Sequence, residues 1–263
     1  MKNFCKYTWI LLVLLFVYAP IIFLAIYSFT DSAIIGNLGS FSLEKYVTLF
    51  TTSELMQMIW GTLILAIGVA LLSTVLGTVG AIGSFYSSRN TSRFIELLNQ
   101  IPVVNADVVT GFSVCILMIA IFHISKDTYI PLVVGQTTLC VPFVYLSVIP
   151  RLKQMENELY EAALDLGCTP QKALIKVVIP QIIPGILSGF VTAMTLSLDD
   201  YFVATYTKPA VFDTISTYVV NATRGARTEI KTALWALSTV IFVIVVLMVV
   251  MNNRFTRDKG KRG

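Results

Sequence analysis

Charged side chains are scarce in this sequence. Asp, Glu, Lys and Arg make up 13% of the 263 residues, 56% are hydrophobic, and the mean hydropathy is +0.79. A soluble globular domain carries about 25% charged residues, so this composition excludes a chain built of soluble domains. Apolar runs of about twenty residues recur, each long enough for a hydrocarbon core about 30 Å thick. These runs are continuous rather than alternating, which excludes a β-barrel and predicts an all-α integral membrane protein.

Metal-binding and nucleotide-binding motifs are also missing. The single histidine, His123, has no Cys, Asp or Glu at metal-ligand spacing, and the four cysteines show no spacing typical of a metal site or a disulfide. The sequence has no G-x4-G-K-[S/T] phosphate loop, because Gly260-Lys261 stands in a polar tail without the preceding glycine. We therefore expect no metal, no cofactor and no enzymatic activity, ATP hydrolysis included, in this chain alone.

The apolar runs predict six membrane-spanning helices, at about 9–29, 59–86, 103–124, 129–150, 177–206 and 232–252. The first run follows Lys2 and Lys6 like a signal peptide, but it continues to Phe29 without an A-x-A cleavage site. We expect a span that is retained. The predicted divisions are a first helix with an outer loop (1–58), a transmembrane core (59–252) and a basic cytoplasmic tail (253–263).

Orientation follows from the positions of the basic residues. If the N-terminus is inside, 13 of the 19 Lys and Arg residues fall on inner segments, including four in 151–176 and five in the tail. Both termini and the hydrophilic segment before the fifth span are therefore predicted to be cytoplasmic.

Three acids, Asp107, Asp199 and Asp200, lie within predicted spans that contain no Lys or Arg. Intramembrane carboxylates are costly and usually mark a transport pathway or a buried pair. On a straight helix Asp107 lies roughly 21 Å beyond Arg93, near mid-membrane, and Asp199 belongs to the outer half. An acidic cavity attracts cations and repels anions. Tyr201 could add a cation–π contact to an ammonium group.

Other roles remain open for these acids. Each could cap a broken helix, be protonated, or pair with a basic residue of another subunit. Adjacent helical positions point about 100° apart, so Asp199 and Asp200 are not expected to do the same job.

The segment from Glu161 to Pro180, EAALDLGCTPQKALIKVVIP, predicts a helix, a turn and a second helix. Good helix formers precede Gly167, which can adopt the left-handed conformation that ends a helix. Thr169 and Pro170 then supply an N-cap and a first helical position. No catalytic constellation lies in this segment, which indicates a docking element.

The spacing E-A-A-x3-G-x9-V-x-I-P in this segment resembles the EAA loop of ABC importer permeases, with Val177 and Ile179 as conservative replacements. The resemblance extends over about residues 57–250 in the number and spacing of spans. FSLEKYVTLF at 41–50, LSLDDY at 196–201 and Asp107 are most similar to the second permease subunits of spermidine/putrescine importers.

The resemblance implies a type I ABC importer transmembrane domain in the bacterial cytoplasmic membrane. Its implied partners are an ABC ATPase dimer that holds ATP and Mg²⁺, a second permease subunit and an extracytoplasmic polyamine-binding protein. It assigns coupling to the ATPase to the loop at 151–180, and polyamine transport to the acidic residues. The coupling residues are Glu161, Ala162, Ala163, Gly167 and Pro180, and the pathway residues are Asp107, Asp199, Asp200 and Tyr201.

Rival functions remain. The cargo could be an amino acid or a metal such as ferric iron, whereas an oxyanion fits poorly without a mid-span cation. A stand-alone ion-coupled carrier would need inverted repeats, which the sequence does not show. A membrane anchor or assembly protein would not need three partnerless intramembrane acids.

Overall fold

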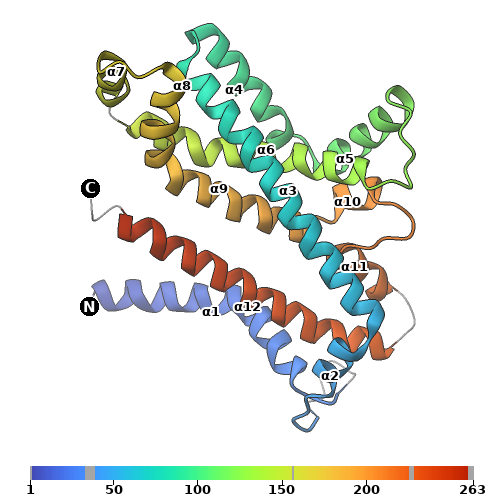
Figure 1. The fold of residues 1–263 in the computed structure, drawn as a ribbon. Coiled ribbons are helices and arrows are strands. Elements are labelled where there is room, and N and C mark those ends of the chain that lie inside the picture. The colour runs from blue at the N-terminus through green and yellow to red at the C-terminus, as the bar shows by residue number, and fades with distance from the viewer. Residues whose placement is uncertain (1, 33–38, 156, 225–227, 260–263) are drawn as a thin grey trace. The chain divides into compact units, whose positions relative to one another are not determined.

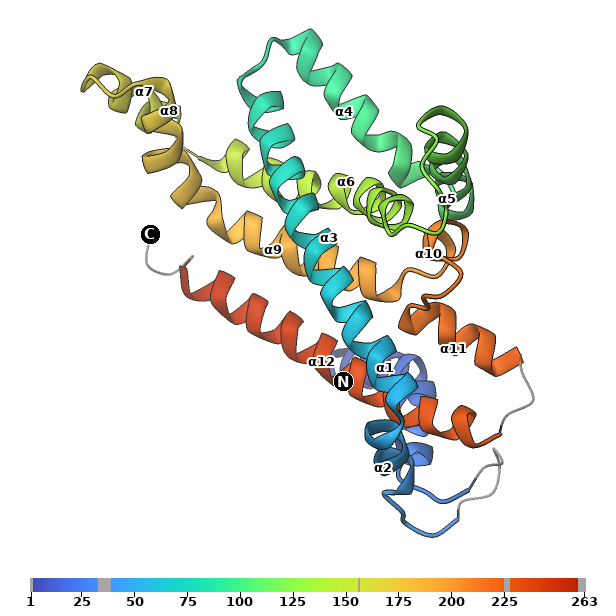
Figure 2. The same ribbon diagram turned by 45° about the vertical axis from the view of Figure 1, so that its right-hand side comes forward.

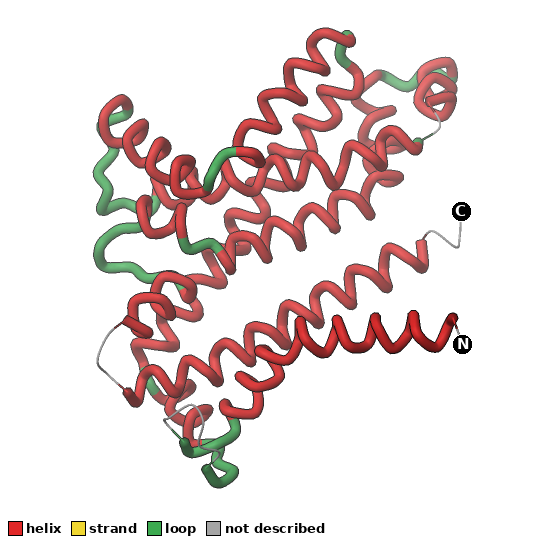
Figure 3. The backbone as a smooth tube through the Cα atoms, turned by 180° about the vertical axis from the view of Figure 1, so that it is seen from behind, coloured by secondary structure: helices red, strands yellow, loops and turns green. Residues whose placement is uncertain are grey.

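A computed structural model describes residues 2–32, 39–155, 157–224 and 228–259. These residues form helices, apart from connecting segments and one isolated bridge between Thr30 and Phe41 (Figure 3). The chain divides into two compact units, one of residues 1–57 and 218–247 and one of residues 58–217 and 248–263. Each unit is described by itself.

The first unit is organised around a buried lysine. Its helices are α1 (Lys2–Ser28), α2 (Glu44–Thr51), most of α11 (Ile215–Arg224) and most of α12 (Thr228–Lys259). The Lys45 ammonium donates to the carbonyls of Tyr27 at 2.7 Å and Ser32 at 2.9 Å. It also lies 4.5 Å from the centre of the Trp235 ring, a cation–π contact. Burial lowers the pKa of Lys45, and the nearby Asp31 opposes that shift. The lysine therefore ties α2 to the end of α1 and to α12.

The second unit holds the remaining helices. They are α3 (Ser53–Tyr86, apart from its first turn), α4 (Arg89–Val104), α5 (Asp107–Ile116), the π-helix η1 (Leu117–Ile121), α6 (Ile130–Gln154), α7 (Asn157–Asp165), α8 (Pro170–Ala173), the π-helix η2 (Leu174–Val178), α9 (Ile179–Asp199) and α10 (Phe202–Thr207). Helices α6 and α9 run side by side in both ribbon views (Figures 1 and 2).

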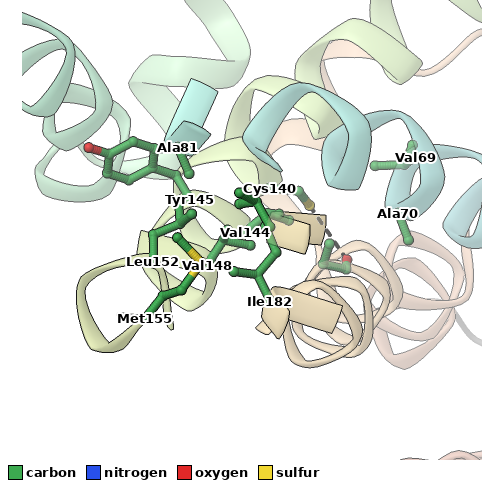
Figure 4. Packing of buried hydrophobic residues seen from close by; sticks show 12 residues of the cluster. Val69, Ala70, Ala81, Cys140, Val144, Tyr145, Val148, Leu152, Met155 and Ile182 are labelled. Carbon is green, nitrogen blue, oxygen red and sulfur yellow. Dashed lines mark hydrogen bonds between the residues drawn. The ribbon is translucent and has the colours of Figure 1, made fainter. Parts of the chain in front are cut away.

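The core of the second unit lies along this helix pair. Val144 and Val148 of α6 and Ile182 of α9 are fully buried, and Val69 of α3 belongs to the same cluster (Figure 4). The Cys140 thiol donates to the carbonyl of Ala193 across the pair at 3.5 Å. Close contact between α6 and α9 thus fixes the direction in which α9 leads toward its end at Asp199.

Among the residues that the structure describes, four helical stretches are long and apolar enough to cross a membrane: Tyr7–Ser28, Ser53–Tyr86, Ile130–Gln154 and Pro170–Asp199. They match the first, second, fourth and fifth predicted spans. The sixth predicted span falls in α12, whose described apolar stretch is Ala233–Leu247. The predicted division at 58/59 and 252/253 stays a prediction.

Two of the predicted spans are not single continuous helices, contrary to the prediction. The helix expected over 103–124 is broken, because Asn105 is extended and α4 and α5 meet at 106°. The helix expected over 177–206 ends at Asp199, because Asp200 is extended (φ −66°, ψ 114°) and α10 starts anew at Phe202. Hydropathy averages over about nineteen residues and does not register a backbone break of two residues.

Candidate functional site

The break between α9 and α10 separates the two adjacent aspartates. Asp199 is the last residue of α9 and its side chain is exposed, whereas Asp200 is only 7% exposed. Tyr201 follows and is half-buried. The two acids thus differ in their surroundings because the helix ends between them, and the expectation that they have different jobs stays a prediction.

Asp200 is a helix cap inside the second unit. Its Oδ1 accepts from the amide of Val203 at 3.0 Å, and its Oδ2 accepts from the amide of Ala204 at 2.9 Å. Nε2 of Gln136, on α6, donates to the same Oδ2 at 3.0 Å. Oε1 of Gln136 in turn accepts from Ser197 Oγ of α9 at 2.7 Å. Side-chain capping of this kind satisfies amides that a helix start leaves without partners.

Asp107 is the first residue of α5, and its side chain is exposed. A carboxylate in the first turn of a helix is favoured by the free amides there. The depth predicted for Asp107 assumed one straight helix from Arg93, and the bend after α4 removes that basis. The prediction that Asp107 lies near mid-membrane therefore rests on a wrong premise.

Helix α10 packs directly against α5 and α6 through two glycines. A Cβ atom on Gly111 of α5 would lie 2.8 Å from the Val203 Cα, and one on Gly135 of α6 would lie 2.8 Å from the Val203 Cγ1. The rings of Phe112 and Tyr206 also meet edge to face, with centroids 5.8 Å apart. These contacts place the helix that starts at Asp107 beside the helix that Asp200 caps.

We expect Gly111→Ala to lower the unfolding free energy by about 1–3 kcal/mol, because the added methyl group meets backbone that cannot move aside. Gly80→Ala is the matched control on α3, where a Cβ meets nothing within 4 Å. An alanine there favours the helix by about 0.5–1 kcal/mol. Thermal melting of the purified protein measures both. Equal melting temperatures for the two variants would contradict close packing of α5 on α10.

The three acids have no basic partner within the part of the chain that the structure describes. An ion pair joins Lys208 to Asp213 at 2.9 Å, after α10. The side chains of Asp199 and Asp107 are exposed, and their carboxylates make no hydrogen bond to a described residue. Their carboxylates are thus available to a cation from outside the chain.

The loop from Glu161 to Pro180 has the predicted helix–turn–helix form. α7 ends in a Schellman motif, in which Gly167 has φ +84°, its amide donates to the Leu164 carbonyl, and the Cys168 amide donates to the Ala163 carbonyl. Thr169 stands at the N-cap of α8, although its side chain makes no cap hydrogen bond.

The loop presents a largely exposed surface. Glu161, Ala162 and Pro180 are exposed, whereas Ala163 is buried. At the tip, Leu166 is 87% exposed. Its side chain is therefore free to contact another protein.

The loop and the aspartates are joined by one helical run. α8, η2 and α9 continue without a break from Pro170 to Asp199. At about 1.5 Å per residue this run is roughly 45 Å long, enough to reach across a membrane. The run therefore connects the loop at one end with the break beside Asp200 at the other.

An apolar cavity of about 610 Å³ lies between α3, α4 and α6. Leu76, Ile95, Val133 and Tyr145 line it, and none of the three acids does. Without a charged wall the cavity offers nothing to a cation, so the exposed carboxylates are the better candidate site.

Sequence reasoning missed Gln136 and Ser197. A glutamine inside an apolar span was the available signal, since a buried amide needs partners. Its partner Asp200 lies 64 residues away in sequence. The pairing therefore depends on the packing of α6 against α9 and α10.

Comparison with known proteins agrees with this architecture. The family model described as "Binding-protein-dependent transport system inner membrane component" matches residues 74–260. The putrescine transport system permease protein PotI of Escherichia coli (strain K12) is 30% identical over 94% of this chain and 92% of its own length. The spermidine/putrescine transport system permease protein PotC of the same strain is 27% identical over 94% and 91%.

Solved structures share the fold. A chain of a bacterial alginate ABC transporter, in complex with its alginate-bound periplasmic protein, has TM-score 0.75 at 19% identity and covers 97% of this chain and 96% of its own. A chain of the MetNI methionine ABC transporter has TM-score 0.59 at 15% identity and covers 79% of this chain and 99% of its own. The matched family model covers most of the chain, and PotI is similar over nearly all of it. The chain is therefore a member of the family of binding-protein-dependent transport system inner membrane components, the permease subunits of ABC importers.

Proposed function

We propose that this chain is one of two permease subunits of an ATP-driven importer that moves polyamines, spermidine or putrescine, into the cytoplasm. The choice of polyamines as cargo rests on two exposed carboxylates, Asp107 and Asp199, which have no basic partner among the described residues. A polyamine carries several ammonium groups, and separated carboxylates suit it. The names of the relatives PotI and PotC support the same class.

The substrate pathway we propose includes Asp107, Asp199, Asp200 and Tyr201. Direct contact with ammonium groups falls to the exposed Asp107 and Asp199, and to the half-buried Tyr201 ring through a cation–π contact. Asp200 adds negative charge from behind this surface, because its oxygens are engaged by Gln136 and by α10.

The partners we propose are a second permease, an ABC ATPase dimer and an extracytoplasmic binding protein. ATP and Mg²⁺ would be held by the ATPases, because this sequence lacks the phosphate loop. The loop with Glu161, Ala162, Ala163, Gly167 and Pro180 would dock on an ATPase from the cytoplasm, with both termini on the same side. Closing the ATPases pushes the loop, and the Pro170–Asp199 run shifts between inward- and outward-facing states.

Amino acids and metals are the competing cargoes, and a stand-alone ion-coupled carrier is the competing mechanism. The carrier leaves the exposed loop tip at Leu166 without a role. A metal ion needs several ligands around one point, and no group of three His, Cys, Asp or Glu residues that could hold one occurs among the described residues.

Uptake of radiolabelled spermidine and putrescine by proteoliposomes holding the whole transporter tests the proposal. We expect ATP- and binding-protein-dependent uptake that is lost when this permease is omitted, and unlabelled amino acids should not compete. Uptake of an amino acid or ferric iron in place of polyamines would overturn the cargo, and uptake without the ATPase would overturn the mechanism.

A further inference from the structure

We propose that Gln136 is a positioning residue for the transport pathway, acting through Asp200. Ser197, Gln136 and Asp200 form a hydrogen-bonded set, the clasp. Gln136 is fully buried, Ser197 is 1% exposed and Asp200 is 7% exposed, so the set is shielded from solvent. The inference rests on the proposed function, because the pathway it positions is the one with Asp107, Asp199 and Tyr201.

The clasp joins three helices at one point. The side-chain oxygen of Gln136 accepts a hydrogen bond from the Ser197 hydroxyl, and its NH₂ group donates one to Asp200. Gln136 therefore bridges α6, α9 and the start of α10. Asp200 completes three accepted hydrogen bonds with the amides of Val203 and Ala204. A buried carboxylate with no cation is tolerated only where such donors surround it.

The clasp sets the direction of the neighbouring pathway groups. Because Asp200 turns inward to Gln136, the chain must leave α9 there, and Asp199 on the other side of the break is exposed. The Leu198 carbonyl, at the end of α9, is held by Ser216 Oγ at 2.8 Å, which fixes the same break from a second side. α10 then packs on Gly111 of α5, four residues after Asp107. One buried amide thus holds the break beside Asp199 and, through α10, the helix that carries Asp107.

A swap of the two side chains tests whether the clasp operates in the working transporter. Gln136→Glu places two carboxylates in contact, and we expect both assembly and uptake to fall to about a tenth or less. In Gln136→Glu/Asp200→Asn the introduced amide donates to the introduced carboxylate, which still accepts from Ser197, while the Ala204 amide loses its acceptor, so recovery is partial. We expect this double variant to exceed Gln136→Glu alone about fivefold in both measurements. A double variant no better than Gln136→Glu would overturn the pairing.

A second comparison tests positioning as distinct from folding. For assembled transporter, we expect Gln136→Leu to raise the KM for spermidine, because Asp199 and Asp107 are no longer held in place. Adding Gln136→Leu to Asp107→Asn/Asp199→Asn should then leave the KM of that double variant unchanged. Two KM effects that multiply would show that Gln136 does not act through these two carboxylates. The assembly of Gln136→Glu and of Gln136→Glu/Asp200→Asn can be measured without any cargo. That measurement therefore tests the pairing of Gln136 with Asp200 even if the transporter does not carry polyamines.

Discussion

We expect Gly167→Val to reduce uptake to about a tenth of the wild-type rate, whereas Gly167→Asn should keep most of it. Gly167 has φ +84°, and a Cβ atom added there would meet nothing within 4 Å, so the cost of a side chain is purely conformational. A left-handed backbone costs an ordinary L-residue about 1–2 kcal/mol, and more for a β-branched side chain. That cost corresponds to about a 5- to 30-fold loss of the correctly turned loop. Asparagine tolerates the left-handed region, which makes it the matched control.

The uptake rate is measured together with the amount of ATPase that copurifies with the permease. The valine variant should lose ATPase or uncouple its ATP hydrolysis from uptake, with the preference between spermidine and putrescine unchanged. Valine and asparagine variants that transport equally well would refute a role for the turn. A changed cargo preference would assign the loop a part in selection that we do not expect.

We expect Asp107→Asn/Asp199→Asn, which removes both exposed carboxylates, to raise the KM for spermidine by about tenfold or more, and each single change to raise it by about three- to fivefold. The reason is electrostatic, because each carboxylate attracts an ammonium group and no basic side chain among the described residues offsets it. The wild-type KM should also rise with ionic strength, since salt screens exposed charges.

Asp127→Asn is the matched control for this charge effect. Asp127 is an exposed acid in the connection between η1 and α6, where it accepts a hydrogen bond from Ser125. The Asp127→Asn variant loses one negative charge away from the proposed pathway, so its KM for spermidine should stay near that of the wild type. Assembly must be intact in all four variants: the double variant, its two single variants and Asp127→Asn. An unchanged KM in the double variant would rule out the carboxylates as the polyamine route.

Local chemistry explains which features could be predicted from the sequence. The turn at Gly167 and the restart at Pro170 depend on residues within a few positions, so the helix–turn–helix was predicted correctly. The breaks at Asn105 and Asp200 are absent from the predicted spans, because apolar neighbours on both sides dominate the hydropathy of a long window, although a broken helix capped by one of the acids was left open.

The candidate site was predicted only in part for a related reason. The sequence placed Asp199 and Asp200 together, but it could not distinguish an exposed acid from a capping one. That distinction depends on Gln136, which reaches Asp200 only through the packing of α6 beside α9 and α10. A pattern read along one span contains no information about a partner 64 residues earlier.

The distance between Gln136 and Asp200 along the chain has a consequence for biosynthesis. A chain is made from its N-terminus, so α6, with its amide and with Gly135, exists before Asp200 leaves the ribosome. The carboxylate therefore meets a donor that is already present when it reaches the bilayer. Asp107 is made before any of these groups. A permease stalled between α6 and α10 would thus contain the acid on α5 and the amide on α6, but not the capped break.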